Sequence, residues 1–215
     1  MLKCVIFDLD GTLLNTIYDL NEALNHVFAE YNLSKKSVEE TTRNIGNGIR
    51  NLIIRSMGSE NNIDEIFKKF MDYYNSHVDV YTKPYDGIND LLLYLKNKDI
   101  KLAVISNKNI VPLTTLINNH FPNMFDIVLG DGMGYKRKPD SEIINECLNK
   151  LNIKKEEVVY IGDSDIDILT TNNSNILGIF VSYGYRDKKI LEENGAKIIC
   201  DSVLELKEYL AKLEL

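Results

Sequence analysis

The stretch VIFDLDGTLLNT, residues Val5–Thr16, runs an apolar segment directly into two aspartates, Asp8 and Asp10. Two carboxylates this close repel each other, by about 1 kcal/mol at ~4 Å in water and about 4 kcal/mol at a partly shielded site. A fold tolerates such a pair only where something cancels the charge or uses it. The stretch therefore predicts a buried strand that ends at a charged site.

The apolar segment is the first of six short runs that are rich in valine and isoleucine. The runs are continuous rather than alternating, and amphipathic helical patterns separate most of them, which is typical of a parallel sheet covered on both faces. We therefore expect a doubly wound, Rossmann-like α/β core. The six runs are residues 3–10, 100–107, 125–131, 157–164, 175–184 and 196–201, and the expected helices of this core are 87–99, 111–121, 138–152, 165–173 and 202–215.

The segment 16–81 breaks this alternation, because it contains helical periodicity and no strand pattern. Thr16 with Asp19, and Ser37 with Glu40, have the spacing of capping boxes at helix starts. The chain returns to the sheet at KPYDGI, where a proline and a glycine interrupt the helical pattern. We expect two domains: an α/β core of residues 1–15 and 82–215, and an inserted all-helical domain of residues 16–81.

The composition excludes several classes of function. The chain has 215 residues, 44% of them hydrophobic and 27% charged, and a net charge of −7, so nucleic acid is not an expected partner. No apolar run approaches the ~20 residues that span a bilayer, and no leader pattern precedes the first strand. The three cysteines are far apart and lie in apolar patterns. They indicate reduced core residues in a cytoplasmic protein that does not bind membranes.

Polar residues follow three of the expected strands at their carboxyl ends, where open parallel sheets bind ligands. Aspartates that gather there form an oxygen-rich site for a hard divalent cation, and Mg²⁺ is the expected cofactor. The cation would cancel the repulsion and let a phosphate approach, and a carboxylate can accept a phosphoryl group while a second one moves the proton. The residues at these strand ends are Asp8, Asp10, Ser106, Asn107, Asp163 and Asp167, with Lys138 in reach.

The segments DLDGT, ISN, KRKP and GDSDID, in that order, resemble the four signature motifs of the haloacid dehalogenase-like hydrolase superfamily, and the helical insert resembles its type-one cap. The resemblance implies that Asp8 is the nucleophile and that Asp10 is the general acid and base. It implies that Ser106, backed by Asn107, holds the phosphoryl group and that Lys138 pairs with it. Implied metal ligands are Asp8, the backbone carbonyl of Asp10, and Asp163, with Asp167 supporting them.

The substrate would be selected by the cap. The segment RNIGNGIRNLI, Arg43–Ile53, resembles the cap loop of phosphoglycolate phosphatases. The resemblance implies that Gly48 lets the backbone approach the ligand and that Arg50 pairs with a substrate carboxylate. Thr12, after the motif-one glycine, belongs with the substrate-binding residues and favours a phosphatase. The expected partner is a small phosphomonoester, with 2-phosphoglycolate the best single choice.

The sequence leaves three other functions open. A β-phosphoglucomutase-like sugar-phosphate mutase would also keep both acids, Asp8 and Asp10. A pyrophosphatase is a close alternative to the phosphomonoester phosphatase, and a phospholigand sensor would have no catalytic activity. Several residues also have a possible structural role without function. Ser106 would then cap a helix, Asp167 would be a charge in the first turn of a helix, and Arg50 and Asp165 would be solvated side chains. Lys136 is the alternative to Lys138 as the lysine of the site. The hinges of the cap are expected near Asn15–Thr16 and Thr82–Pro84. The protein would be a monomer or homodimer.

Overall fold

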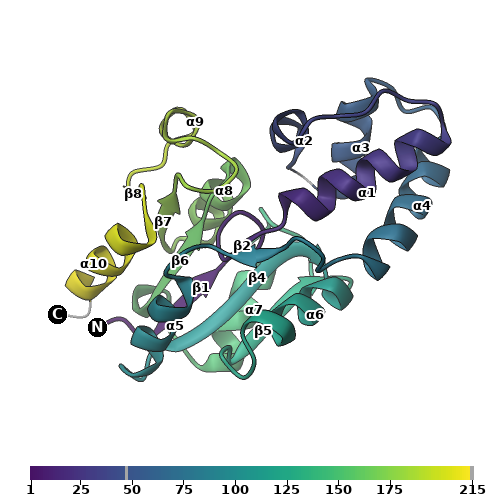
Figure 1. The fold of residues 1–215 in the computed structure, drawn as a ribbon. Helices are drawn as coiled ribbons and strands as arrows, with labels where there is room; N and C mark the ends of the chain where they lie inside the picture. Colours follow the sequence, from purple (N-terminus) through teal and green to yellow (C-terminus); the bar gives the residue numbers. More distant parts are fainter. Residues whose placement is uncertain (47, 214–215) are drawn as a thin grey trace. The chain divides into compact units, whose positions relative to one another are not determined.

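The computed structural model describes residues 1–46 and 48–213, and it divides the chain into two compact units (Figure 1). One unit consists of Met1–Leu14 together with the chain from Pro84 onward, and the other of Asn15–Lys83. Two short strands, β2 (Leu14–Asn15) and β3 (Lys83–Pro84), lie where the chain crosses between the units, and they pair as a separate two-stranded sheet.

In the described residues, the larger unit is built on a six-stranded sheet in the order β5-β4-β1-β6-β7-β8, with every neighbouring pair parallel. The six apolar runs of the sequence are these six strands, and the predicted α/β fold is confirmed. The strands are β1 (Cys4–Phe7), β4 (Lys101–Asn109), β5 (Ile127–Asp131), β6 (Val158–Gly162), β7 (Leu177–Val181) and β8 (Ile199–Cys200).

Helices connect these strands, as the sequence predicted, with one addition. The helix α9 was not expected, because six residues are too few to show a helical period. It is held at its start by Asp187, whose carboxylate accepts the Ile190 backbone N–H at 2.9 Å. The helices of this unit are α5 (Ile88–Lys96), α6 (Ile110–His120), α7 (Glu142–Leu151), α8 (Asp165–Ser174), α9 (Lys188–Glu193) and α10 (Val203–Leu213), with a short 3-10 turn at Lys155–Glu157.

The strand β1 lies in the middle of the sheet, paired with β4 on one side and β6 on the other. Its residues are fully buried, and Cys4 and Ile6 pack in one cluster with Cys147 of α7. Burial raises the pKa of the Cys147 thiol to about 12 and that of Cys200 to about 11. These thiols are packing residues, as the sequence indicated.

The smaller unit is a bundle of helices around its own apolar core. Its helices are α1 (Ile17–Glu30), α2 (Val38–Asn44), α3 (Ile49–Met57) and α4 (Ile63–Ser76). The predicted capping box at the start of α2 is confirmed, because Ser37 and Glu40 exchange hydrogen bonds between side chain and backbone. The fully buried apolar side chains of this unit include Ala23, Leu24, Leu52, Ile53 and Phe70.

The predicted capping box at Thr16 is wrong, since Thr16 makes no side-chain capping bond. The carboxylate of Asp19 instead accepts the backbone N–H groups of Tyr81 and Thr82, each at 2.9 Å, and the Thr82 hydroxyl at 2.6 Å. Asp19 is almost fully buried. It therefore fastens the outgoing and returning ends of the helical unit to each other instead of capping its own helix.

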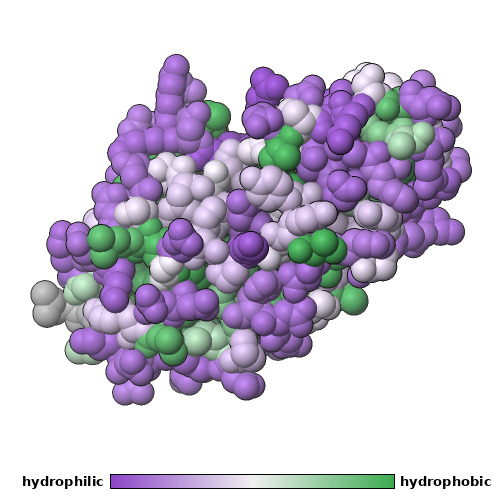
Figure 2. Space-filling view, viewed as in Figure 1, coloured by the Kyte–Doolittle hydropathy of each residue, from purple (hydrophilic) through white to green (hydrophobic). Residues whose placement is uncertain are grey.

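The face of the molecule shown in Figure 2 is mostly polar: hydrophilic residues cover most of its area, and hydrophobic residues form small, separate groups. Among the described helices, none combines the length and the apolar character that a bilayer crossing requires.

Candidate active site

The carboxyl ends of β1, β4 and β6 bring the predicted core residues to one edge of the sheet. Asp8 follows β1, Ser106 lies on β4, and Asp163 follows β6, with β1 between its two partners. Gly11 turns the chain immediately after the first two aspartates, with φ +87°. That backbone conformation favours glycine, and a side chain at Gly11 would also strike the Asp163 carboxylate, since its Cβ would lie 2.2 Å from an oxygen.

Lys138 lies at the centre of this edge, with its side chain 2% exposed. Its ammonium nitrogen is 3.0 Å from Asp8 Oδ1, 2.8 Å from Asp167 Oδ1 and 2.7 Å from the Tyr160 hydroxyl. Burial would lower the pKa of Lys138, but the two carboxylates raise it above its usual range. Lys138 is therefore protonated. Its ammonium donates hydrogen bonds to Asp167 Oδ1 and to the Tyr160 hydroxyl, and it forms an ion pair with Asp8, whose buried Oδ1 has no hydrogen-bond partner among the described residues.

Asp167 is the most heavily hydrogen-bonded acid of the edge. Besides Lys138, its Oδ1 accepts the Tyr160 hydroxyl at 2.7 Å, and its Oδ2 accepts the Ser164 hydroxyl at 2.6 Å and the backbone N–H groups of Asp163 and Ser164 at 3.2 and 3.1 Å. Burial would raise the pKa of Asp167, but Lys138 and these donors hold it below its usual range. Asp167 is an ionised anchor for its neighbours.

Asp163 is held from two sides. Its Oδ1 accepts the Thr12 hydroxyl at 3.1 Å, and its Oδ2 accepts the Tyr185 backbone N–H at 2.7 Å. A Cβ at Gly184 would lie 2.5–2.6 Å from Asp163 side-chain atoms, so this wall of the site also depends on a glycine. Each carboxylate oxygen of Asp163 thus has one hydrogen bond from the protein and retains lone-pair capacity toward a further partner.

Asp8, Asp163 and Asp167 form one acidic cluster, because they offer carboxylate oxygens that all lie within 4.8 Å of one another. Burial raises the pKa of Asp8 to about 7, against the opposing effect of Lys138. Burial and the charges of Asp167 and Asp8 also raise the pKa of Asp163 well above its usual range. One ammonium does not balance three buried acids, so the cluster has the charge and the ligand type of a divalent cation site.

The end of β4 places three consecutive polar residues at the same edge. The Ser106 hydroxyl oxygen accepts the Lys108 backbone N–H at 3.2 Å. The amide of Asn107 bonds both ways to the Lys138 backbone, donating to its carbonyl and accepting from its N–H, each at 2.9 Å. The Lys108 ammonium lies 2.9 Å from Asp10 Oδ1. Asn107 thereby fixes the segment that carries Lys138.

The sequence model that describes haloacid dehalogenase-like hydrolases matches residues 5–181, which is most of the chain. The chain belongs to this family. A phosphoglycolate phosphatase of Agrobacterium fabrum is 31% identical over 91% of this chain and 87% of its own length. The phosphoglycolate phosphatase of Chromobacterium violaceum is 28% identical over 97% and 96%.

A solved structure agrees with these relatives. A candidate phosphoglycolate phosphatase from Lactobacillus delbrueckii subsp. bulgaricus superposes with a TM-score of 0.91 at 33% identity, over 97% of this chain and 98% of that one. The predicted family and the predicted enzyme class, a phosphoric monoester hydrolase, are confirmed.

Within this haloacid dehalogenase-like hydrolase, the core residues that the sequence singled out share one edge, and two of them have partners that the sequence did not reveal. The Thr12 hydroxyl donates to Asp163, and the Asn107 amide is engaged with the Lys138 backbone. Lys136, the alternative to Lys138 in the same motif, has a side chain that is 72% exposed, and its ammonium lies 3.6 Å from Asp140. Asp165 lies 3.7 Å from Arg186 Nε, so it has a basic neighbour rather than water alone.

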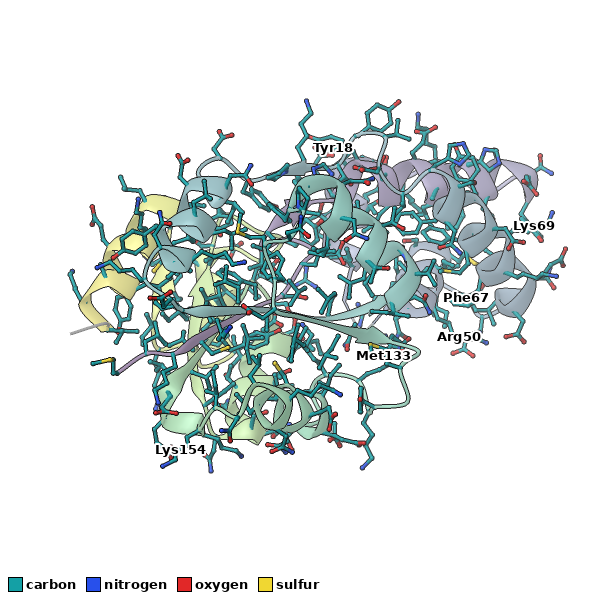
Figure 3. All side chains as sticks on the ribbon, turned by 90° about the horizontal axis from the view of Figure 1, so that it is seen from below. Tyr18, Arg50, Phe67, Lys69, Met133 and Lys154 are labelled. Carbon is teal, nitrogen blue, oxygen red and sulfur yellow. The ribbon has the colours of Figure 1, made fainter. Side chains whose placement is uncertain are left out.

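The two residues predicted from the cap loop lie in the helical unit, where Gly48 is the N-cap of α3 with φ +87° and Arg50 follows in the first turn. The Arg50 guanidinium pairs with Asp64 of α4 and lies 6.0 Å from the centre of the Phe67 ring. Figure 3 shows Arg50 and Phe67 next to each other. Arg55 of α3 donates to the backbone carbonyls of Asn44 and Gly46 at 3.1 and 3.2 Å, which holds the preceding segment.

Sequence reasoning missed two residues of the site. Tyr160 lies in the middle of an apolar strand, and its pattern is that of a core aromatic, yet its hydroxyl bonds Lys138 and Asp167. Lys108 lies at the end of β4, and its ammonium contacts Asp10. Two features of the sequence could have indicated these residues. Tyr160 carries a hydroxyl within an otherwise aliphatic strand, and Lys108 is the third consecutive polar residue at a strand end.

Proposed function

We propose that this protein is a Mg²⁺-dependent phosphatase that hydrolyses small phosphomonoesters through an aspartyl-phosphate on Asp8, with 2-phosphoglycolate as its substrate. The observation that carries the proposal is the buried contact of Asp8 with Lys138, 3.0 Å long, beside the acidic cluster. The relatives named phosphoglycolate phosphatases support the choice of substrate.

The donor set of the acidic cluster fits Mg²⁺, which prefers carboxylate and carbonyl oxygens and usually retains several waters. Asp8, Asp163 and the backbone carbonyl of Asp10 would hold it. Asp167 would support these ligands without touching the ion, because each of its oxygens already accepts at least two hydrogen bonds. When bound, the ion would neutralise negative charge on the phosphoryl group and the carboxylates.

Asp8 would attack the phosphorus, forming the acyl-phosphate bond while the ester P–O bond breaks. The Lys138 ammonium would orient the nucleophile and stabilise the phosphoryl oxygens, with the Ser106 hydroxyl and nearby backbone N–H groups as further donors. The geometry supports this arrangement because an ion pair with Asp167 and a hydrogen bond to Tyr160 hold the Lys138 ammonium in place. Positioning of this kind is the main contribution that a protein makes to phosphoryl transfer.

Asp10 would give its proton to the oxygen of the departing alcohol. It would then take a proton from water as that water attacks the aspartyl-phosphate, so that inorganic phosphate leaves and Asp8 is restored. Water is consumed once, and each carboxylate returns to its starting state. Its position two residues after Asp8 supports this role.

We also propose that Asn15–Lys83 acts as the cap, which would exclude water from the reaction and select the substrate. Gly48 and Arg50 would contribute to that selection, and Thr12 would act on the substrate through Asp163. The enzyme would work in the cytoplasm as a monomer or homodimer without binding nucleic acid. Three buried free thiols and the net charge of −7 support this setting.

The test is phosphate release by the purified protein, with and without Mg²⁺, on 2-phosphoglycolate, pyrophosphate, nucleoside monophosphates and hexose phosphates. We expect Mg²⁺-dependent release with the highest kcat/KM on 2-phosphoglycolate. Broad and weak release would retain the phosphatase and overturn the substrate. Isomerisation of a hexose phosphate without net phosphate release would replace the phosphatase with a mutase.

A further inference from the structure

The side chain of Lys108 is buried in the α/β unit, although lysine is among the residues least often found inside proteins. It is 6% exposed, and its ammonium lies 2.9 Å from Oδ1 of Asp10, which is itself 19% exposed. The proposed phosphoryl chemistry needs Lys138 and gives Lys108 no task. A second buried ammonium, next to the acid proposed to protonate the departing alcohol, calls for its own explanation.

Lys108 reaches this position because β4 is irregular at its end. The pairing of β4 with β5 shifts register between Ile105 and Asn109, so Ser106, Asn107 and Lys108 lie within the irregular segment. In a regular strand, successive side chains point to opposite faces of the sheet. Here all three residues make contacts at the site edge, with one another, with Lys138 and with Asp10. Bulges next to active sites commonly redirect side chains in this way.

We propose that Lys108 recognises an acidic group on the alcohol part of the substrate, so that specificity for 2-phosphoglycolate begins in the α/β unit. This inference rests on the proposed function. Asp10 would protonate the ester oxygen, so its carboxyl group must come within hydrogen-bond distance of that atom. In 2-phosphoglycolate a single methylene separates the ester oxygen from the carboxylate. A cation 2.9 Å from Asp10 is therefore well placed to receive that carboxylate.

The chemistry of the two residues fits this task. An ammonium group has three N–H donors and can serve Asp10 and a ligand carboxylate at the same time. Hydrogen bonds between charged partners are the strong ones, and they are stronger away from water. A site built to hydrogen-bond a charged substituent rejects analogues that lack it, because one donor of its buried group then loses that acceptor. A carboxylate would be favoured, an alcohol less so, and an ammonium least.

The experiment compares three phosphate esters that share the unit P–O–CH₂: 2-phosphoglycolate, 2-hydroxyethyl phosphate and phosphoethanolamine. The kcat/KM of each is measured for the wild type, for Lys108→Met and for Lys108→Arg, with Mg²⁺ present. We expect the wild type to prefer them in the order given. In Lys108→Met all three rates fall, because Asp10 loses this ion pair. The preference for 2-phosphoglycolate over 2-hydroxyethyl phosphate should also fall, by about tenfold to a hundredfold, as expected for a lost hydrogen bond to a charged group.

Lys136→Met is the matched control, since that lysine is exposed and its nearest acid is Asp140. It should keep the wild-type preference, and Lys108→Arg should keep more of it than Lys108→Met. Thermal melts check that each variant is folded. Equal losses on all three esters in Lys108→Met would overturn the inference and leave Lys108 as a support for Asp10.

The wild type alone provides a test that needs no variant. A wild type that cleaves phosphoethanolamine as well as 2-phosphoglycolate overturns the inference and the proposed substrate together. A wild type that prefers 2-phosphoglycolate, with a Lys108→Met variant that keeps the full preference, leaves the substrate standing and removes only the role of Lys108. A wild type that cleaves none of the esters overturns the proposed function itself.

Discussion

The acidic edge of the sheet and the segment around Arg50 hold their charged residues in opposite ways. Lys138 is 2% exposed and has three partners, all of them buried. Arg50 is 48% exposed and pairs with Asp64, which is 89% exposed. Buried charges must be matched by fixed partners, so their geometry is set before any ligand arrives. An exposed ion pair contributes little to stability, so either residue can exchange its partner for a ligand at little cost in free energy.

The first way to test this contrast is to remove the nucleophile. In Asp8→Asn the amide cannot form an acyl phosphate, so we expect kcat to fall on the order of 10⁴-fold. The fold should survive, because the substitution conserves volume and removes one of three mutually repelling acids. Phosphate release at a large fraction of the wild-type rate, in a protein with a wild-type circular dichroism spectrum, would exclude Asp8 as the nucleophile.

The second test removes the cation. After dialysis against EDTA we expect phosphate release to fall on the order of a hundredfold or more, because three carboxylates then repel the incoming phosphate. Added Mg²⁺ should restore the rate, and Ca²⁺, which has the same charge and looser geometry, should restore less of it. Full activity in the presence of the chelator would contradict the proposed cation site.

The third test removes the Tyr160 hydroxyl, which accepts a hydrogen bond from Lys138. Tyr160→Phe leaves one ammonium donor and one Asp167 acceptor short of a buried partner, which costs about 1–3 kcal/mol per group. We expect kcat to fall by about tenfold while KM changes little, since Tyr160 would position Lys138 without touching the substrate. The measurement is steady-state kinetics together with a thermal melt.

Tyr209→Phe on α10 is the matched control for this variant, because Tyr209 has no contact with Lys138 or Asp167 among those described. It should behave as the wild type. A Tyr160→Phe variant with raised KM and unchanged kcat would argue instead for a role in binding.

The smallest effect is expected at the exposed pair. Arg50→Gln should change the melting temperature by no more than about 2 °C, since exposed ion pairs contribute little to stability. If Arg50 leaves Asp64 to bind a substrate carboxylate, KM for 2-phosphoglycolate should rise several-fold while KM for 2-hydroxyethyl phosphate stays the same. Asp64→Asn is the companion variant, and we expect it to lower KM slightly, because the guanidinium is then released from its partner.

The fold could be predicted well because its signals are local and repeated. The runs around Cys4–Phe7 and Val158–Gly162 are continuous and apolar, which is what strands buried on both faces require. The capping box at Ser37 also depends only on neighbours in sequence. Thr16 and Asp19 have the same spacing, but partners 62 and 63 residues away take the carboxylate, and no local pattern reveals them.

The sequence predicted which core residues of the site lie close together, but it did not predict the hydrogen bonds and ion pairs between them. Strand ends indicated Asp8, Asp163 and Asp167 because parallel strands meet at one edge. The partners of Lys138 depend on side-chain direction: Tyr160 points toward the site from within a strand, and the register shift near Asn107 redirects Lys108. These are properties of three-dimensional packing, and a sequence read in one dimension does not contain them.

The central place of β1 has a consequence for how the protein is made. The strand β1 is synthesised before both of its partners, β4 and β6, which begin at Lys101 and Val158. Until the chain has been made as far as β4, this entirely apolar strand has neither neighbour to pair with. Long-range pairing of this kind is slow and leaves nascent chains open to wrong associations. The same order means that Asp8 emerges long before Asp163, so no prefix of the chain that ends before β6 can assemble the acidic cluster.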